Sequence, residues 1–145
     1  MTSVKYKGNL LATESRGGFG GIPFEISPYS NDDSIIKITI GENDQGYVGK
    51  LKVEYSGSHT EETGLGESGL TSLALESGEY FNNVIIRSGD YVNHLKIITN
   101  KNRHIEVGQI EGGITAHILE NRKVIGFYGT TGSWCDGLGV LYEKI

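Results

Sequence analysis

The stretch GYVGKLKVEY at residues 46–55 is the first of three that share one order of aromatic, apolar and small residues. The second is DYVNHLKIIT at residues 90–99, and the third is SWCDGLGVLY at residues 133–142. The aromatic residues of the three stretches, Tyr47, Tyr91 and Trp134, recur at intervals of 44 and 43 residues. A nearly constant interval of this length indicates similar units that bury a shared core. The chain is therefore expected to contain three related hairpins.

Apolar and polar residues alternate along these stretches, as at Leu51, Val53 and Tyr55, and a period of two is typical of half-buried strands. The same pattern predicts strands at residues 80–86, 114–119 and 123–128. No convincing helix is found, and LTSLALESGEY at residues 70–80 is interpreted as a strand followed by a turn.

Glycine-rich segments lie between the predicted hairpins: RGGFGG at 16–21, GLGESG at 64–69 and GQIEGG at 108–113. Glycine accounts for 22 of the 145 residues and proline for only 2, which favours many tight turns over a disordered chain. Three short antiparallel sheets joined in this way can pack around a pseudo-threefold axis, each hiding one face against the other two. The predicted fold is all-β, a three-sided β-prism formed by one domain.

The bulk composition excludes several classes of partner. With a net charge of −5 and scattered Lys and Arg, the chain lacks the basic stripe that a nucleic acid requires. No apolar run is long enough for membrane insertion, and the start of the chain lacks the apolar core of a signal peptide. Cys135 is the only cysteine. Cytoplasmic location and secretion without a recognisable signal peptide both remain open.

Enzyme and cofactor signatures are weak. GLGESG formally matches a dinucleotide fingerprint, but the helix that this motif needs does not follow it. The four histidines lack zinc-ligand spacing, and Cys135 has no nucleophile signature and is expected to pack inside its hairpin. The neighbours Asp32 and Asp33, like Glu61 and Glu62, are interpreted as solvated turns. We therefore expect no metal, no cofactor and no enzymatic activity.

The turn Gly132-Ser133-Trp134-Cys135-Asp136 is the strongest candidate for a binding site. Successive backbone N–H groups beside a carboxylate supply donors and acceptors for the hydroxyls of a sugar, and Trp134 can cover an apolar sugar face. Gly17 to Gly21 is the candidate partner loop, because glycines let a ligand approach the main chain. A purely structural interpretation, with Asp136 closing the turn and Trp134 in the core, stays open from these residues alone.

The chain resembles the jacalin-related lectins, especially in SGEYFNNVIIRSGDYVNHLKIITNKNR at residues 77–103, and the resemblance covers about residues 15–145. It implies a β-prism I fold of three Greek-key sheets, in which a sugar lies between a glycine-rich loop and a G-x-x-x-D loop. Here GGFGG and GSWCD form that pair. Asp136 would accept hydrogen bonds, and residues 133–135, Gly20 and Gly21 would present main-chain groups.

The other two loop pairs depart from the family pattern. The middle hairpin carries Asp90 and has Asn93 at the aspartate position, opposite Gly113, so only a weak second site is expected there. The first hairpin has Gly49 at that position, which predicts an inactive pair. By the resemblance, Tyr91 would lean over the neighbouring intact site.

The resemblance also implies a ligand class. Sixteen residues precede Gly17, which favours the uncleaved branch of the family that binds mannose- or glucose-type glycans, with galactose as an alternative. A sugar-silent interaction module of an adhesin or toxin is the other alternative. One shallow site reaches about millimolar affinity, so a homodimer or higher oligomer is expected. Residues 1–145 are expected to form a single lectin domain, with 1–14 as an N-terminal strand or arm.

Overall fold

The computed structural model describes residues 11–18, 20–30, 32–64, 68–132 and 135–145, and all of its regular structure in these ranges is β. The strands are β1 (Leu11–Ala12), β2 (Arg16–Gly17), β3 (Ile22–Ile26), β4 (Ile35–Glu42), β5 (Val48–Tyr55), β6 (His59–Thr63), β7 (Ser68–Ala74), β8 (Phe81–Ser88), β9 (Val92–Thr99), β10 (His104–Gly108), β11 (Gly113–Ile118), β12 (Arg122–Thr131) and β13 (Cys135–Lys144). The described residues include no helix with the length and apolar character needed to cross a membrane.

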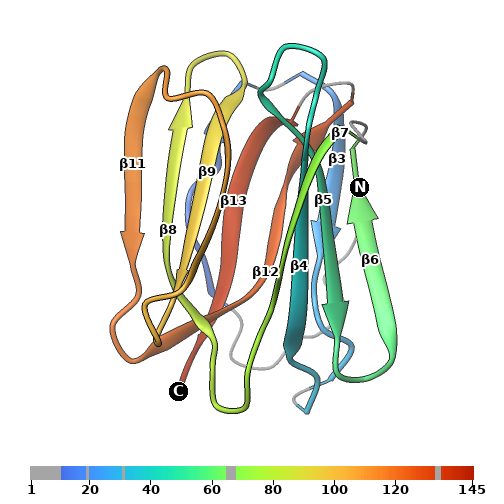
Figure 1. Cartoon of the computed structure of the whole chain (residues 1–145), viewed down its shortest axis with the longest axis vertical. Coiled ribbons are helices and arrows are strands. Elements are labelled where there is room, and N and C mark those ends of the chain that lie inside the picture. The colour runs from blue at the N-terminus through green and yellow to red at the C-terminus, as the bar shows by residue number, and fades with distance from the viewer. Residues whose placement is uncertain (1–10, 19, 31, 65–67, 133–134) are drawn as a thin grey trace.

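The strands form three antiparallel sheets (Figure 1). Their orders are β6-β5-β4-β7, β10-β9-β8-β11 and β1-β13-β12-β3, with β2 also paired to β13. In the first two sheets the fourth strand returns beside the first, which is a Greek key. The predicted β-prism is therefore confirmed, and the tips of the β4–β5 and β8–β9 hairpins lie at the upper end of Figure 1, where β12 ends and β13 begins.

The pseudo-threefold relation is visible in strand register. Each hairpin closes with an irregular pair just before its tip: Glu42 with Val48, Ser88 with Val92, and Thr131 with Cys135. Because the same irregularity occurs at three equivalent places, it is a regular part of the fold. It changes the direction of the residues that follow in each hairpin. The position after each closing pair is Gly49, Asn93 or Asp136. The sequence repeat thus corresponds to a structural repeat.

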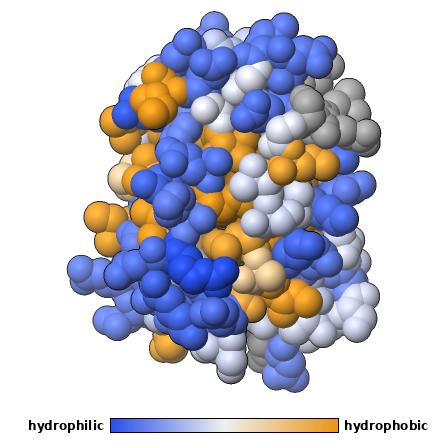
Figure 2. All heavy atoms as spheres, in the orientation of Figure 1, coloured by the Kyte–Doolittle hydropathy of each residue, from blue (hydrophilic) through white to orange (hydrophobic). Residues whose placement is uncertain are grey.

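The core lies between the three sheets, where the inner faces of the strands meet. Val48, Val92 and Cys135 belong to it, all at most 4% exposed, as the alternating pattern predicted for Cys135. Figure 2 shows polar residues over the hairpin end and apolar residues along the margin formed by β11.

Outer strands were harder to recognise in the sequence. The edge strands β6 and β10, HTEET and HIEVG, were not predicted, because β6 has no apolar residue and β10 has only two, although Ile105 and Val107 are both buried in the core. The predicted strand and turn at residues 70–80 are confirmed as β7 followed by a turn in which Glu79 N–H donates to Glu76 O.

One interpretation of the acidic residues was wrong. Asp33 is 7% exposed. Its carboxylate accepts hydrogen bonds from the backbone N–H groups of Gly57 at 2.7 Å and Tyr29 at 3.1 Å, and it also contacts His59 Nε2. Burial alone would raise the pKa of Asp33, but these bonds outweigh it and hold the pKa below its ordinary value. Glu61 lies in β6, with a side chain only 10% exposed. Both acids are structural rather than solvated.

Candidate functional site

The glycine loop at residues 17–21 lies directly against the start of β13. Gly18 N–H donates to the carbonyl oxygen of Asp136 at 2.7 Å, and Gly17 is paired with Gly137. Gly17 has φ +112°, and a Cβ there would lie 2.2 Å from the Asp136 carbonyl oxygen, so only glycine fits. The two segments that the sequence analysis combined into one site are therefore neighbours in space.

The same loop passes over the Asp136 side chain. A Cβ built on Gly20 would lie 2.7 Å from Asp136 Oδ2, and one on Gly21, where φ is +84°, would collide with the backbone of Thr131. A side chain at Gly20 would fill the space beside the carboxylate. Glycine leaves the main chain bare at this point, so that a ligand can reach it.

The Asp136 carboxylate has an unusual environment. The residue is only 7% exposed, and no residue in the described part of the chain donates a hydrogen bond to its side chain. Burial raises the pKa of Asp136 above its ordinary value. An acceptor that is desolvated and has no donor among the described residues costs stability, and a hydroxyl group could supply the missing donor.

The backbone contact at Gly17 occurs in all three repeats. A Cβ on Gly64 would lie 2.0 Å from the carbonyl oxygen of Gly49, and one on Gly108 would lie 2.2 Å from that of Asn93. Both glycines have positive φ, +85° and +108°. The three loop pairs thus share one main-chain scaffold and differ in the side chain at the key position.

The middle loop pair is bonded internally. Asn93 Nδ2 donates to Glu111 O at 3.4 Å, and a Cβ on Gly112 would lie 3.0 Å from the same nitrogen. The tip of the first hairpin also reaches this loop. Tyr47 Oη donates to Glu111 Oε2 at 2.6 Å, and this bond raises the pKa of Tyr47. Gln109 Nε2 donates to the carbonyl oxygen of Gln45 at 3.1 Å.

The tip of the middle hairpin in turn touches the first glycine loop. A Cβ on Gly18 would lie 2.3 Å from the carbonyl oxygen of Asp90, and the next residue, Tyr91, is 37% exposed. The tip of the middle hairpin at Asp90 therefore lies beside the first glycine loop, as the tip of the first hairpin at Tyr47 lies beside Glu111. No sequence pattern indicated the bond between Tyr47 and Glu111, because these residues are 64 positions apart in the chain.

The remaining predicted site residues are placed as follows. Gly132 follows β12, and a Cβ there would meet nothing within 4 Å, whereas Cys135 points into the core. Gly113 begins β11 and is exposed. Ser133 and Trp134 lie outside the described residues, so their predicted contacts stay predictions.

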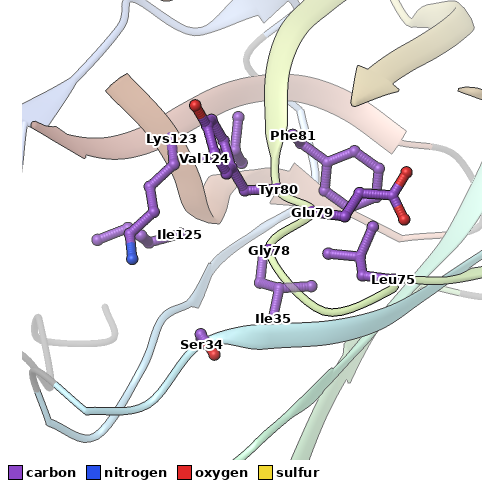
Figure 3. Close-up of a pocket in the computed structure, with 10 residues that line it drawn as sticks. All are labelled: Ser34, Ile35, Leu75, Gly78, Glu79, Tyr80, Phe81, Lys123, Val124 and Ile125. Atoms are coloured by element: carbon purple, nitrogen blue, oxygen red, sulfur yellow. The ribbon is translucent and has the colours of Figure 1, made fainter. Parts of the chain in front are cut away.

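Two surface hollows lie at different ends of the prism. One of about 460 Å³ adjoins the candidate site and is lined by Ile22, Pro23, Phe24, Thr63, Gly64, Thr131 and Gly132. The other, of about 310 Å³, lies at the opposite end of the prism beside the turn that carries Glu79 (Figure 3). Its charged groups have partners, since Glu79 accepts from Thr99 Oγ1 at 2.7 Å and Lys123 Nζ lies 3.3 Å from Glu143. Within the described residues, no group of three or more His, Cys, Asp or Glu side chains is arranged to hold a metal.

Comparison with known proteins gives a consistent picture. Jacalin-related lectin 35 of Arabidopsis thaliana is 29% identical over 140 residues, and the match covers 87% of this chain but 30% of that protein. The chain thus spans about a third of the length of this curated relative.

Solved structures agree in fold. The wild-type Malaysian banana lectin superimposes with a TM-score of 0.80 at 23% identity, covering 93% of this chain and 99% of that one. A mannose-binding jacalin-related lectin from Ananas comosus gives 0.82 at 20% identity, covering 95% and 100%. Artocarpin complexed with Me-α-mannose gives 0.80 at 21% identity, covering 94% and 99%. A family model described as the Jacalin-like lectin domain matches residues 13–141, and the chain therefore belongs to the jacalin-like lectin family.

Proposed function

We propose that this chain is a non-enzymatic lectin that binds mannose- or glucose-type glycans between the glycine loop 17–21 and Asp136. The observation that supports this most strongly is the buried Asp136 carboxylate, which receives no hydrogen bond from the described residues and lies beside the bare main chain of Gly20.

The chemistry of a sugar matches these groups. A sugar hydroxyl both donates and accepts, so vicinal hydroxyls can donate to Asp136 and accept from the N–H groups of Gly21 and Cys135. Tyr91, partly exposed beside the loop, is a described aromatic residue that can cover an apolar sugar face. The mannose-binding pineapple lectin and the artocarpin complex, which share the fold, favour mannose over galactose as the first ligand to test.

A binding role also agrees with the state of Cys135. Burial and the neighbouring Asp136 raise the pKa of its thiol to about 12. The residue is 4% exposed and lies in the core, where a protonated thiol is inert. Cys135 is therefore proposed to be structural rather than a nucleophile.

Useful avidity would come from several copies. A single shallow sugar site has about millimolar affinity, near −4 kcal/mol, so we propose that the chain acts as a homodimer or higher oligomer on glycoproteins. Residues 1–145 would then supply one lectin domain with one strong site and a weak second site at Asn93.

The test is calorimetric titration with methyl α-mannoside on Asp136→Ala, with Asp44→Ala as the matched control. Asp44 lies exposed in the tip of the first hairpin, so both variants lose one negative charge. We expect Asp136→Ala to abolish binding and Asp44→Ala to keep it. Binding unchanged in Asp136→Ala would refute the site. Saturable binding of methyl α-galactoside, without binding of methyl α-mannoside, would identify galactose as the ligand. A glycan array without hits would favour the alternative of a sugar-silent interaction module.

A further inference from the structure

The strand β11 is an edge strand with unusual chemistry. It pairs with β8 on one side, and no other described strand pairs with it on the other (Figure 1). Unpaired edges are usually protected by charge, proline or cover. Among the other edge strands of five residues or more, β3 carries Pro23 and Glu25, β6 carries two glutamates, β10 carries Glu106, and β7 contacts β10 of the next sheet.

By contrast, β11 has the sequence GITAHI, without a charged residue or proline. Burial and the nearby Arg16 hold the pKa of His117 below its ordinary value, so this side chain is neutral at pH 7. Ile114 is 60% exposed and Ile118 is 73% exposed. Figure 2 shows the apolar residues along this margin of the molecule.

The direction of the free backbone groups follows from the pairing with β8. Leu119 N–H donates to Asn82 O at 2.9 Å, so in the antiparallel ladder the residues at 117, 115 and 113 also bond toward β8. The N–H and C=O groups of Ile114, Ala116 and Ile118 therefore point away from the sheet. The side chains of the same three residues stand on its exposed outer face.

These residues form a self-complementary set, because ITAHI reads as a near palindrome about Ala116. When two copies of the strand run antiparallel about a two-fold axis at Ala116, Ile114 faces Ile118 of the second copy and Ala116 faces Ala116. Each of these facing pairs can exchange both of its backbone hydrogen bonds. In this arrangement apolar side chains face apolar side chains. Other surfaces are less suited to contact between copies, because each copy has a net charge of −5.

We propose that β11 is a homodimer interface, at which the edge strands of two copies join two four-stranded sheets into one continuous eight-stranded sheet. Antiparallel pairing inverts one protomer relative to the other. Because β11 begins at the hairpin end of the prism, the two Asp136 sites would face opposite directions. The dimer would then crosslink two glycosylated surfaces, a consequence that rests on the proposed function, whereas the interface itself does not.

The first experiment measures mass by light scattering after gel filtration. The wild-type chain is expected at twice the chain mass, and Ala116→Lys is expected as a monomer, because two lysines would face each other at the axis. Ile36→Lys is the control, since Ile36 is 46% exposed on another sheet and the variant carries the same added charge. A monomeric wild type, or an Ala116→Lys variant that stays dimeric, would overturn the proposal.

A second variant keeps the test decisive if Ala116→Lys misfolds. Facing residues of a hydrogen-bonded antiparallel pair have Cα atoms about 5.5 Å apart, which suits a disulfide. Ala116→Cys should therefore form a covalent dimer under mild oxidation, and Ile36→Cys should not; equal crosslinking of both would contradict the register. Per-chain affinity for methyl α-mannoside should be the same in wild type and in Ala116→Lys, while only the wild type aggregates mannan-coated beads. Dimers that bind no sugar would refute the lectin function and leave the interface standing.

Discussion

The loop pairs at Asp136 and at Asn93 have the same main-chain scaffold and opposite hydrogen-bonding states. In both, a glycine with positive φ packs against the carbonyl oxygen of the key residue. The Asp136 carboxylate has no hydrogen-bond donor among the described residues, whereas Asn93 donates to Glu111, which Tyr47 also binds. On the proposed function, the pair at Asp136 keeps an acceptor for a ligand, whereas the pair at Asn93 bonds its own groups.

The aspartate at position 136 carries a cost in folding stability. Burial raises the pKa of Asp136, so the folded state binds its proton more tightly than the unfolded state does. The stabilising effect of that proton is present at low pH and is lost as pH rises through the folded-state pKa. At neutral pH the ionised side chain therefore lowers the stability of the fold.

The largest effect is expected when the third loop pair is given the side chain of the second. Asp136→Asn should weaken binding of methyl α-mannoside by at least about 100-fold, or about 3 kcal/mol, because two charge-assisted bonds are lost. Its thermal midpoint at pH 7 should equal or exceed that of the wild type. Calorimetry measures the affinity and a melting curve measures the thermal midpoint. Intact binding together with a lower midpoint would show that Asp136 serves stability rather than sugar binding.

The converse exchange should create a site. Asn93→Asp places a charged acceptor beside Gly112, and the stoichiometry of sugar binding per chain should rise from one to two. Calorimetry at high protein concentration measures it. Adding Glu111→Gln should strengthen the new site by removing a nearby like charge. An unaltered stoichiometry in both variants would mean that the shared scaffold is insufficient.

A smaller effect is expected from the glycine loop. Gly21→Ala should weaken sugar binding by about tenfold and lower the free energy of unfolding by about 1–3 kcal/mol, because φ is +84° and the methyl group meets Thr131. Gly89→Ala is the control, since nothing lies within 4 Å of a Cβ there. Urea denaturation measures the stability, and equal effects of both substitutions would contradict this assignment.

The smallest expected effect is a pH dependence. Affinity for methyl α-mannoside should be constant near neutral pH and should fall several-fold as pH drops through the raised pKa of Asp136, so that the loss begins at a higher pH than it would for an ordinary aspartate. Titrations at several pH values measure this. In Asn93→Asp, a second sugar lost at a different pH would show that the two carboxylates have different environments.

Much of this arrangement was predictable from the sequence, for reasons that also explain the failures. The 44-residue spacing and the alternation at Leu51, Val53 and Tyr55 predicted the hairpins, because inner strands need one apolar face. The edge strand β6 lacks that face, and β10 shows it only in the short alternation of Ile105 and Val107. The pairing of GGFGG with GSWCD came from resemblance to a family, because no local pattern indicates which distant loops meet.

Contacts between repeats could not be predicted at all. The bond from Tyr47 to Glu111 joins two loops that look unrelated in sequence, and Asp33 looked like a surface acid until His59 and Gly57 were seen to surround it. The first contact depends on how neighbouring sheets pack, and the second on how two turns of one sheet meet; periodicity encodes neither.

Three glycines, Gly17, Gly64 and Gly108, each leave room for the carbonyl oxygen of the residue opposite. The shape of each loop pair therefore depends on main-chain geometry alone. On the proposed function, a sugar site at any one of the three loop pairs can be gained or lost without refolding, by a change of the residue whose carbonyl oxygen the glycine faces. Valency in such a scaffold can drift during evolution while its shape stays constant, so two chains with superimposable backbones can differ in how many ligands they hold.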